Sequence, residues 1–232
     1  MSPARLLAVS LAASAATPYL DPEVPLDARV RDLVSRMTLD EKVFQLAVDA
    51  PAIPRLGLGA FGWWNECVHG VVAEGATIFP QAIALAATWD PELVLGVAEA
   101  ISDEARALHA LGRVGLTFWS PVMNLARDPR WGRVQESYGE DPWLAARMGV
   151  AFVRGLQGDD PRYLKVVATP KHFAANSEET HRFGGSAAVP ERLLRAYYLP
   201  HFAACVREAG AASVMCAYNA INGVPWCANR KL

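Results

Sequence analysis

The sequence Asn124-Leu-Ala-Arg-Asp-Pro-Arg-Trp-Gly-Arg133 carries three arginines and one aspartate between two segments rich in aromatic residues. Residues 116–119 precede it and predict a buried strand. Residues 136–142 follow it, contain turn-forming glycine and proline, and lead into a predicted helix. Charged residues at the carboxyl end of a buried strand lie where α/β proteins place ligand contacts. The alternative is a structural loop held together by salt bridges.

Short apolar segments and helix-length segments alternate along the rest of the chain. Strands are predicted at residues 56–64, 116–119, 163–169 and 211–217, and helices at residues 27–37, 38–46, 81–87, 91–111, 142–156 and 190–208. This alternation is typical of parallel βα units. Because charged motifs follow successive strands, the predicted fold class is α/β, as a (β/α)₈ TIM-type barrel. No Gly-x-Gly-x-x-Gly follows a strand, so a dinucleotide-binding fold has no support.

Three of the predicted helices begin with clear N-terminal signals. Thr38-Leu-Asp-Glu41 has the pattern of a capping box. Asp90-Pro91 and Asp141-Pro142 each place an N-cap aspartate before a proline at the first helical position. Local chemistry therefore predicts where these helices start.

The composition is that of an ordinary globular protein, with 232 residues, 52% hydrophobic and 20% charged, and a formal charge of −2. A near-neutral charge without a basic run argues against nucleic acid as a partner. No window beyond the N-terminal segment has the ~18 consecutive apolar residues of a membrane helix, so no membrane partner is expected. Seven Trp and six Tyr fit a sugar-binding protein, and they fit a large hydrophobic core equally well.

Residues 1–16 combine a basic start, a short apolar run and small residues, the pattern of a secretory signal peptide. The alternative is a helical N-terminal arm. With a signal peptide the protein is expected to be secreted, either extracellular or periplasmic. Residues 17–232 are expected to form a single, C-terminally truncated barrel, because a complete (β/α)₈ barrel usually takes about 250 residues.

Four cysteines are present, and no CxxC metal pattern occurs among them. Cys216 and Cys227 flank a turn-rich loop over residues 218–225, which could bring them together in an oxidising compartment. The alternative is two free buried thiols.

Three further motifs lie on either side of the central arginine stretch: residues 63–70 (WWNECVHG), residues 171–176 (KHFAAN) with Arg182, and residues 214–220 (VMCAYNA). Together with residues 127–136 they resemble the N-terminal barrel of glycoside hydrolase family 3, which contains β-glucosidases, β-xylosidases and related exo-acting enzymes. The resemblance runs from about residue 26 to the last residue. Four multi-residue motifs in the same order make it specific.

The resemblance implies a sugar-binding pocket at the mouth of the barrel. It places Lys171, His172, Arg182 and Arg133 in that pocket, where they hydrogen-bond the hydroxyls of the sugar in the first subsite. Arginine suits this role because its donors form a rigid fork. The alternative for residues 171–172 is a strand end that reaches solvent. The other charged residues of the central loop are expected to hold the loop together; these are Arg127, Asp128 and Arg130.

Two further site residues are implied by the resemblance. Glu66 matches a carboxylate that accepts hydrogen bonds from the distal hydroxyls of the sugar. Many glucosidases of the family have aspartate at this position. Taken alone, Glu66 could be a general acid or base, or a surface glutamate. Tyr218 follows the last predicted strand and is implied to support a catalytic carboxylate, with a half-buried core tyrosine as the alternative. Glu178 and Glu179 are expected to support the loop that carries Arg182.

The family's nucleophile and acid/base lie beyond the segments that this chain matches, so no catalytic residue is assigned within it. The predicted function is the N-terminal part of a retaining exo-β-glycosidase that hydrolyses β-linked xylosides or glucosides in carbohydrate catabolism. Neither a cofactor nor a metal is expected, and the expected partner is a small-molecule β-glycoside or an oligosaccharide. By itself the chain is expected to be inactive. The alternatives are a non-catalytic sugar-binding fragment and a barrel of unrelated function. Oligomeric state and linkage preference stay open.

Overall fold

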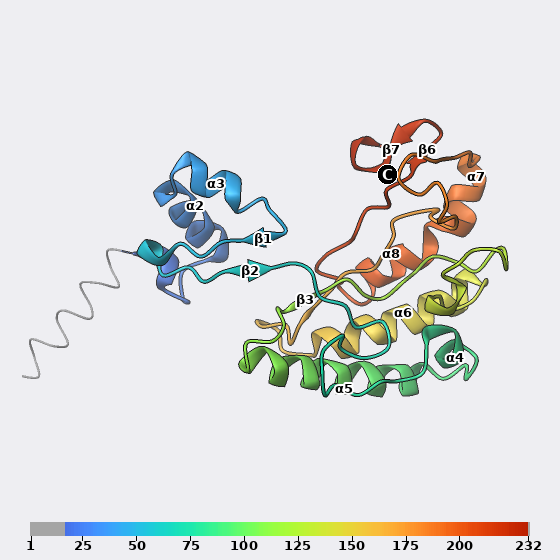
Figure 1. Cartoon of the computed structure of the whole chain (residues 1–232), viewed down its shortest axis with the longest axis horizontal. Helices are drawn as coiled ribbons and strands as arrows, with labels where there is room; N and C mark the ends of the chain where they lie inside the picture. Colours follow the sequence, from blue (N-terminus) through green and yellow to red (C-terminus); the bar gives the residue numbers. More distant parts are fainter. Residues whose placement is uncertain (1–16, 232) are drawn as a thin grey trace, which may run out of the picture. The chain divides into compact units, whose positions relative to one another are not determined.

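The computed structural model describes residues 17–231, and the predicted signal peptide at residues 1–16 lies outside this range. The chain divides into two compact units after Gly62 (Figure 1). The prediction of one partial barrel over residues 17–232 stays a prediction.

The first unit consists of short helices and one antiparallel hairpin. Its helices are η1 (Pro18–Leu20), α2 (Leu26–Arg36), α3 (Leu39–Phe44) and η2 (Pro54–Leu56), and its strands are β1 (Asp49–Ala50) and β2 (Phe61–Gly62). The capping box is confirmed, because Thr38 and Glu41 each accept a hydrogen bond from the other's backbone N–H. The strand predicted over residues 56–64 is wrong for most of its length. The η2 turn and Gly57, with φ of 66°, redirect the chain before β2 begins.

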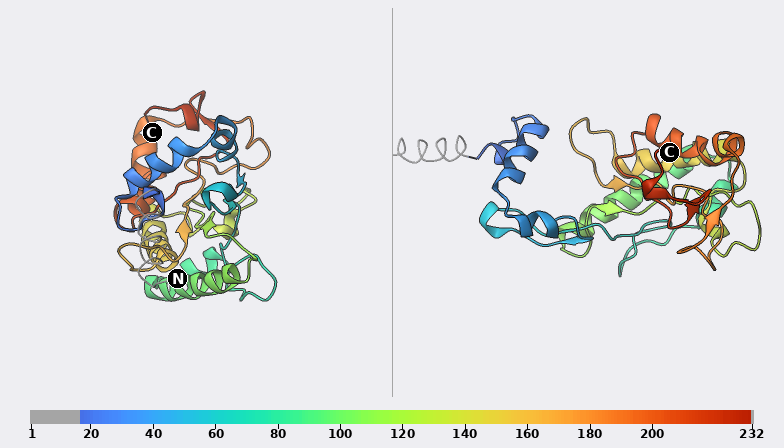
Figure 2. Two further views of the ribbon diagram at one scale, coloured as in Figure 1. Left: turned by 90° about the vertical axis from the view of Figure 1, so that its left-hand side faces the viewer. Right: turned by 90° about the horizontal axis from the view of Figure 1, so that it is seen from above.

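The helices of the second unit pack side by side in the order α5, α6 and α8, as both Figure 1 and Figure 2 show. Its α-helices are α4 (Ala82–Ala86), α5 (Pro91–Ala110), α6 (Pro142–Gln157), α7 (Glu191–Leu193) and α8 (Pro200–Arg207). The N-caps of α5 and α6 are confirmed. Asp90 accepts from the N–H groups of Glu92 and Leu93, and Asp141 accepts from that of Leu144.

The continuous helix predicted over residues 190–208 is instead divided. A π-helical segment, η4 (Leu194–Tyr198), separates α7 from α8. Pro200 lacks the N–H that a helix interior requires, so the α-helical hydrogen-bond ladder is interrupted just before it. The sequence-based prediction of a helix is therefore right for most of this segment but misses the interruption.

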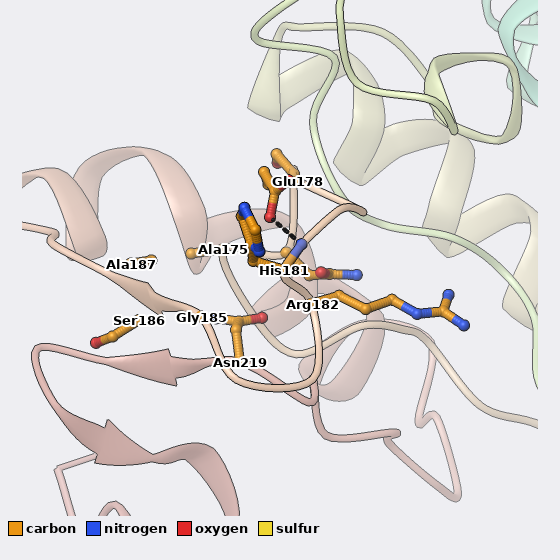
Figure 3. A pocket seen from close by; sticks show the side chains of 10 residues that line it. Ala175, Glu178, His181, Arg182, Gly185, Ser186, Ala187 and Asn219 are labelled. Carbon is orange, nitrogen blue, oxygen red and sulfur yellow. Dashed lines mark hydrogen bonds between the residues drawn. The ribbon is translucent and has the colours of Figure 1, made fainter.

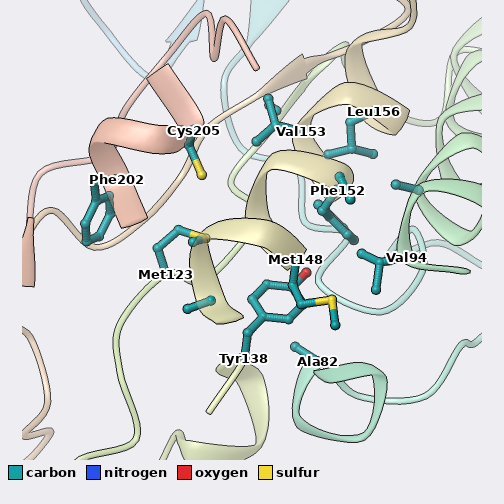
Figure 4. Close-up of a cluster of buried hydrophobic side chains, with 14 of the residues drawn as sticks. Ala82, Val94, Met123, Tyr138, Met148, Phe152, Val153, Leu156, Phe202 and Cys205 are labelled. Atoms are coloured by element: carbon teal, nitrogen blue, oxygen red, sulfur yellow. The ribbon is translucent and has the colours of Figure 1, made fainter. Parts of the chain in front are cut away.

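Helix α6 is the centre of the hydrophobic core. Most of its residues are buried, and Met148, Phe152 and Leu156 project into the cluster that Figure 4 shows. Gly155 lets α5 and α6 approach closely, because a Cβ there would lie 2.6 Å from both the Leu95 carbonyl oxygen and the Ala98 Cβ. Helix α6 also packs against β4 (Val167–Ala168), the strand that leads to Lys171.

The strands of the second unit are short and mainly parallel. They are β3 (Thr117–Phe118), β4 (Val167–Ala168), β5 (Ser186–Ala187), β6 (Ala220–Ile221) and β7 (Val224–Pro225), with short 3₁₀ turns η3 (Val134–Glu136) and η5 (Trp226–Ala228). β3 pairs in parallel with β4, and β5 in parallel with β6, while β6 and β7 form an antiparallel hairpin. Because the unit combines α-helices with parallel strand pairs, the predicted α/β class is confirmed.

Two isolated parallel bridges extend the pairing towards the site, Val122 with Lys171 and Phe173 with Cys216. The strand predicted at residues 163–169 is present only as β4, and that predicted at residues 211–217 is reduced to the bridge at Cys216. These contacts align the chain after β3, the chain after β4 and the segment before Tyr218 beside one another. Among the described residues, no helix is long and apolar enough to cross a membrane.

Cys216 and Cys227 have free thiols and lie on either side of the β6–β7 hairpin. Both are exposed, unlike the buried thiols of the sequence-based alternative. Partial burial and the Cys227 thiol raise the pKa of Cys216 to about 11.

We expect Cys216 and Cys227 to oxidise to a disulfide outside a reducing compartment. Because the closed loop is short, the disulfide would stabilise the fold by roughly 3 kcal/mol or less. Non-reducing peptide mapping detects the Cys216–Cys227 disulfide. Free thiols at both positions after air oxidation would contradict the prediction.

Candidate functional site

The residues around Glu66 are held against the end of β3 by hydrogen bonds between side chains and the backbone. Asn65 Oδ1 accepts from Gly115 N–H, and Asn65 Nδ2 donates to the Thr117 carbonyl, both at 2.9 Å. The Ser120 hydroxyl accepts from Cys67 N–H at 3.2 Å. Glu66 therefore lies at the carboxyl edge of the parallel strands, although it is far from them in the sequence.

Lys171 and Glu66 form an ion pair at this edge. The Lys171 Nζ donates to Glu66 Oε1, and only 3% of the Lys171 side chain is exposed, against 28% of the Glu66 side chain. Pro121 and Met123 hold the backbone of Lys171 from both sides, at 2.9 and 2.6 Å. The sequence-based alternative for Lys171, a strand end that reaches solvent, is therefore wrong.

Burial opposes the charge on both partners of this pair. It raises the pKa of Glu66, an effect that the Lys171 ammonium counteracts. It also lowers the pKa of Lys171, which the Glu66 carboxylate counteracts. Charges that are partly removed from water interact more strongly with polar groups, so a ligand hydroxyl that reaches this pair would be held firmly.

His172 is fixed in one tautomer by Asn124. Asn124 Oδ1 accepts from the backbone N–H of His172 and lies 2.8 Å from its Nδ1, while Asn124 Nδ2 donates to the His172 carbonyl. An amide oxygen only accepts, so His172 Nδ1 carries the proton. His172 Nε2 is then an acceptor, and it lies 3.1 Å from Arg133 Nη1.

His172 is consequently neutral at physiological pH. Burial is the main cause that lowers its pKa to about 2, followed by the positive charges of Arg133, Lys171 and Arg182. A neutral imidazole between cationic groups acts here as a hydrogen-bonding group and not as a charge.

Arg133 is oriented by Glu136, one turn further along the loop. Its Nε and Nη2 bind the two Glu136 carboxylate oxygens at 2.7 and 2.6 Å. The fork geometry holds the guanidinium plane in place and leaves Nη1 for His172. Arg133 thus connects the ion pair with Glu136 to the His172 network.

An open cleft of about 250 Å³ lies over this cluster. It is lined by Glu66, Val68, His69, Val72, Gln81, Arg133, Gln135, Glu136 and Lys171. Two carboxylates face two cations, so the lining is close to electrically neutral and rich in both donors and acceptors. Such a lining suits a small, uncharged, hydroxyl-rich ligand better than an anion or a cation.

Arg182 and Tyr218 form a second group beside this cluster. Arg182 Nη1 binds Glu179 Oε2 at 3.0 Å, and Glu179 Oε1 accepts from Trp131 Nε1 at 3.1 Å. Tyr218 is exposed, and the Arg182 guanidinium lies 5.8 Å from its ring centroid. The structure therefore brings four of the six predicted residues, Glu66, Arg133, Lys171 and His172, into one cluster, with the other two adjacent.

The supporting roles predicted for neighbouring charges agree with the contacts. Arg130 pairs with Asp128 at 2.5 Å, and Arg127 donates to the Tyr198 hydroxyl at 2.6 Å, so both stabilise the central loop. Glu178 accepts from the His181 backbone N–H at 2.8 Å within a second cavity of about 360 Å³ (Figure 3). Figure 3 shows Arg182 pointing away from the part of that cavity near Ser186.

Two residues of the candidate site were not predicted from the sequence. Asn124, at the start of the arginine stretch, was given no role, yet it sets the tautomer of His172. Glu136 was likewise given no role of its own, although its i,i+3 spacing from Arg133 indicates an ion pair. Within the part of the chain that the structure describes, no group of three or more His, Cys, Asp or Glu could hold a metal ion.

Comparison with known proteins identifies the family. Residues 38–232 match the glycosyl hydrolase family 3 N-terminal domain. The chain is 44% identical to beta-D-xylosidase 1 of Arabidopsis thaliana over 225 residues, which cover 90% of this chain and 29% of that protein. It is 47% identical to a probable exo-1,4-beta-xylosidase of Aspergillus oryzae, over 88% of this chain and 28% of that protein.

Solved structures agree with these relatives. A family 3 exo-beta-xylosidase in complex with a xylobiose aziridine probe superposes with a TM-score of 0.87 at 36% identity, over 93% of this chain and 30% of that one. DesR, a beta-glucosidase from Streptomyces venezuelae in complex with D-glucose, gives a TM-score of 0.75 at 35% identity, over 88% of this chain and 26% of that one. The chain spans about 30% of the length of the relatives it matches. It belongs to glycosyl hydrolase family 3, within the N-terminal domain of that family.

Proposed function

We propose that this chain is the sugar-binding part of a secreted, retaining exo-β-glycosidase that acts on β-xylosides, in a protein whose N-terminal domain is a TIM-type barrel. The observation that carries the proposal is the cluster of buried Lys171 and His172 with half-buried Glu66 and Arg133, which lies at a nearly neutral cleft. A pyranose presents several hydroxyls, each both donor and acceptor. The cluster offers carboxylate acceptors, ammonium and guanidinium donors, and side chains that are already held in place.

The two carboxylates of the cleft are poorly suited to cleaving a glycosidic bond. Glu66 is paired with Lys171, and both oxygens of Glu136 are occupied by Arg133. A retaining enzyme needs a nucleophilic carboxylate that forms a glycosyl ester and a second carboxyl group about 5–5.5 Å away that acts as acid and then base. We propose that residues outside these 232 supply both groups and that this chain alone binds the sugar without turnover. Neither step requires a cofactor.

Preference for the pentose is proposed to depend on the length of Glu66. Its side chain is one methylene longer than the aspartate of many glucosidases in the family, and Lys171 holds it in the cleft. The additional length would occupy the volume that the hydroxymethyl group of glucose requires, which xylose lacks. The relatives named as β-xylosidases support this reading.

Binding of methyl β-D-xyloside and methyl β-D-glucoside to the purified chain tests the proposal, measured by ligand-observed NMR titration. The wild-type chain is expected to prefer the xyloside. Glu66→Asp should shift the xyloside-to-glucoside affinity ratio towards glucose by about tenfold, because one methylene typically contributes ~1–3 kcal/mol of discrimination.

Glu66→Gln is the matched control, because it keeps the length of the side chain and removes its charge. It should weaken the binding of both glycosides and leave the xyloside-to-glucoside affinity ratio unchanged. No binding of either sugar by the wild-type chain would reject the sugar site. An unchanged ratio in Glu66→Asp would reject only the steric argument.

A further inference from the structure

Ser120 is a fully buried residue at the point where the chain leaves β3, and it has no role in the function proposed so far. Its backbone N–H donates to the Phe118 carbonyl, and its own carbonyl accepts from Thr169 N–H, both at 2.9 Å. These contacts fix Ser120 between the ends of two parallel strands. A hydroxyl that is removed from water costs free energy unless it is hydrogen-bonded, so the partners of the Ser120 hydroxyl indicate its role.

The Ser120 hydroxyl bridges two consecutive residues of the loop that carries Glu66. Its Oγ accepts from Cys67 N–H at 3.2 Å and donates to Glu66 Oε2 at 3.4 Å. A hydroxyl has one proton, and an N–H group can only donate. Cys67 therefore occupies the acceptor side of Oγ, which leaves the proton for the Glu66 carboxylate. At 3.4 Å this second hydrogen bond is long, so it orients the carboxylate more than it stabilises the fold.

The two oxygens of the Glu66 carboxylate are consequently held from different strand ends. Lys171, which follows β4, donates to Oε1, and Ser120, which follows β3, donates to Oε2. An ammonium group acts as a point charge, so Lys171 alone would leave the carboxylate free to turn about its last single bond. A second donor on a fixed backbone removes that freedom and sets the plane of the carboxylate.

Among the described residues that line the cleft, Glu66 is present and Ser120 is not. Any influence of Ser120 on a ligand would therefore pass through Glu66. We infer that Ser120 is a positioning residue for selection of the pentose, because its hydroxyl holds Glu66 Oε2 where the hydroxymethyl group of a hexose would otherwise lie. The inference rests on the proposed sugar-binding function. It adds that the length of Glu66 discriminates between the two sugars only while Ser120 fixes the orientation of the carboxylate.

The test measures the affinities of the purified chain for methyl β-D-xyloside and methyl β-D-glucoside by ligand-observed NMR titration. Ser120→Ala should lower the xyloside-to-glucoside affinity ratio by about 3- to 10-fold, the range that loss of one intramolecular hydrogen bond implies. Ser120→Cys keeps a side chain of similar size with only a weak donor, so it should lower the ratio as well. Ser120→Thr keeps the hydroxyl and should retain the wild-type ratio.

Ser102→Ala is the matched control. Ser102 is equally buried, and its hydroxyl donates to the Glu99 and Gly155 carbonyls at 2.9 and 3.0 Å, within and between α5 and α6. Its loss should lower the free energy of unfolding and leave the affinity ratio unchanged. In the Glu66→Asp background, Ser120→Ala should have little further effect on the ratio, because two changes that act through one contact are not additive.

An unchanged ratio in both Ser120→Ala and Ser120→Cys, or an equal decrease in Ser102→Ala, would overturn the positioning role. Additive effects of Ser120→Ala and Glu66→Asp would overturn it too, because Ser120 would then act by a route other than Glu66. In these cases both glycosides still bind, so the proposed sugar site stands. Absence of binding of both glycosides by wild type would overturn the sugar site and the positioning role with it.

Discussion

Replacing Lys171 by methionine should lower the free energy of unfolding by about 3 kcal/mol at neutral pH, since removal of one partner from a buried ion pair leaves the other charge uncompensated. Glu66 would be that charge, and burial already raises its pKa. Without Lys171 the pKa of Glu66 should rise further, so the loss should be smaller at pH 4.5 than at pH 7.5. Urea denaturation at the two pH values measures both effects.

Lys165→Met is the control for this prediction. Lys165 pairs with Asp103 at 2.7 Å, but both side chains are much more exposed, at 30% and 75%. An exposed pair typically contributes about 0–1 kcal/mol, so this variant should be nearly as stable as wild type. The double variant Lys171→Met/Glu66→Gln should recover part of the stability lost in Lys171→Met. If Lys165→Met and Lys171→Met lowered the free energy of unfolding by the same amount, the Lys171–Glu66 pair would contribute no more stability than the exposed pair, and the prediction would be wrong.

Acid should destabilise the protein steeply between about pH 6.5 and pH 4, because two buried histidines resist protonation. Burial lowers the pKa of His201 to about 4 and, with nearby cations, that of His172 to about 2. The unfolded chain takes up protons below about 6.5, whereas the folded chain does not, so stability falls as pH falls. One such histidine contributes about 1.4 kcal/mol per pH unit in this window, and two contribute about twice that slope. The raised pKa of Glu66 acts in the opposite direction and offsets part of the loss.

His201→Leu isolates one of these contributions. His201 is 1% exposed, and among the described residues its Nδ1 has no hydrogen-bond partner. An apolar side chain of similar size should therefore maintain stability at pH 7 and reduce the slope by about half. Exposed His109, changed to Gln, serves as the control and should leave the slope unchanged. Denaturant midpoints across the pH range give the slopes, and a wild-type slope in His201→Leu would contradict the argument.

Helix starts were predictable because their signals are local. Asp90 and Asp141 bond N–H groups two or three residues away, so a few consecutive residues contain the whole interaction. The strands were much less predictable. Only two residues of the segment at 163–169 form a ladder, because apolar sequence indicates burial, whereas pairing depends on a partner elsewhere in the chain. The π-helical segment before Pro200 likewise depends on how the chain repacks around a missing N–H.

By itself the sequence determined the family, the order of the motifs and the residue types at the site. Only the tertiary structure decided how these side chains combine. Lys171 meets Glu66 across 105 residues, and Asn124 sets the tautomer of His172 across 48. Both contacts arise because parallel pairing aligns distant segments at one edge, and Lys171, Asn124 and His172 are buried there. Residue type specifies which hydrogen bonds and charges are available, whereas strand register and burial specify which partners meet and which groups lose their charge.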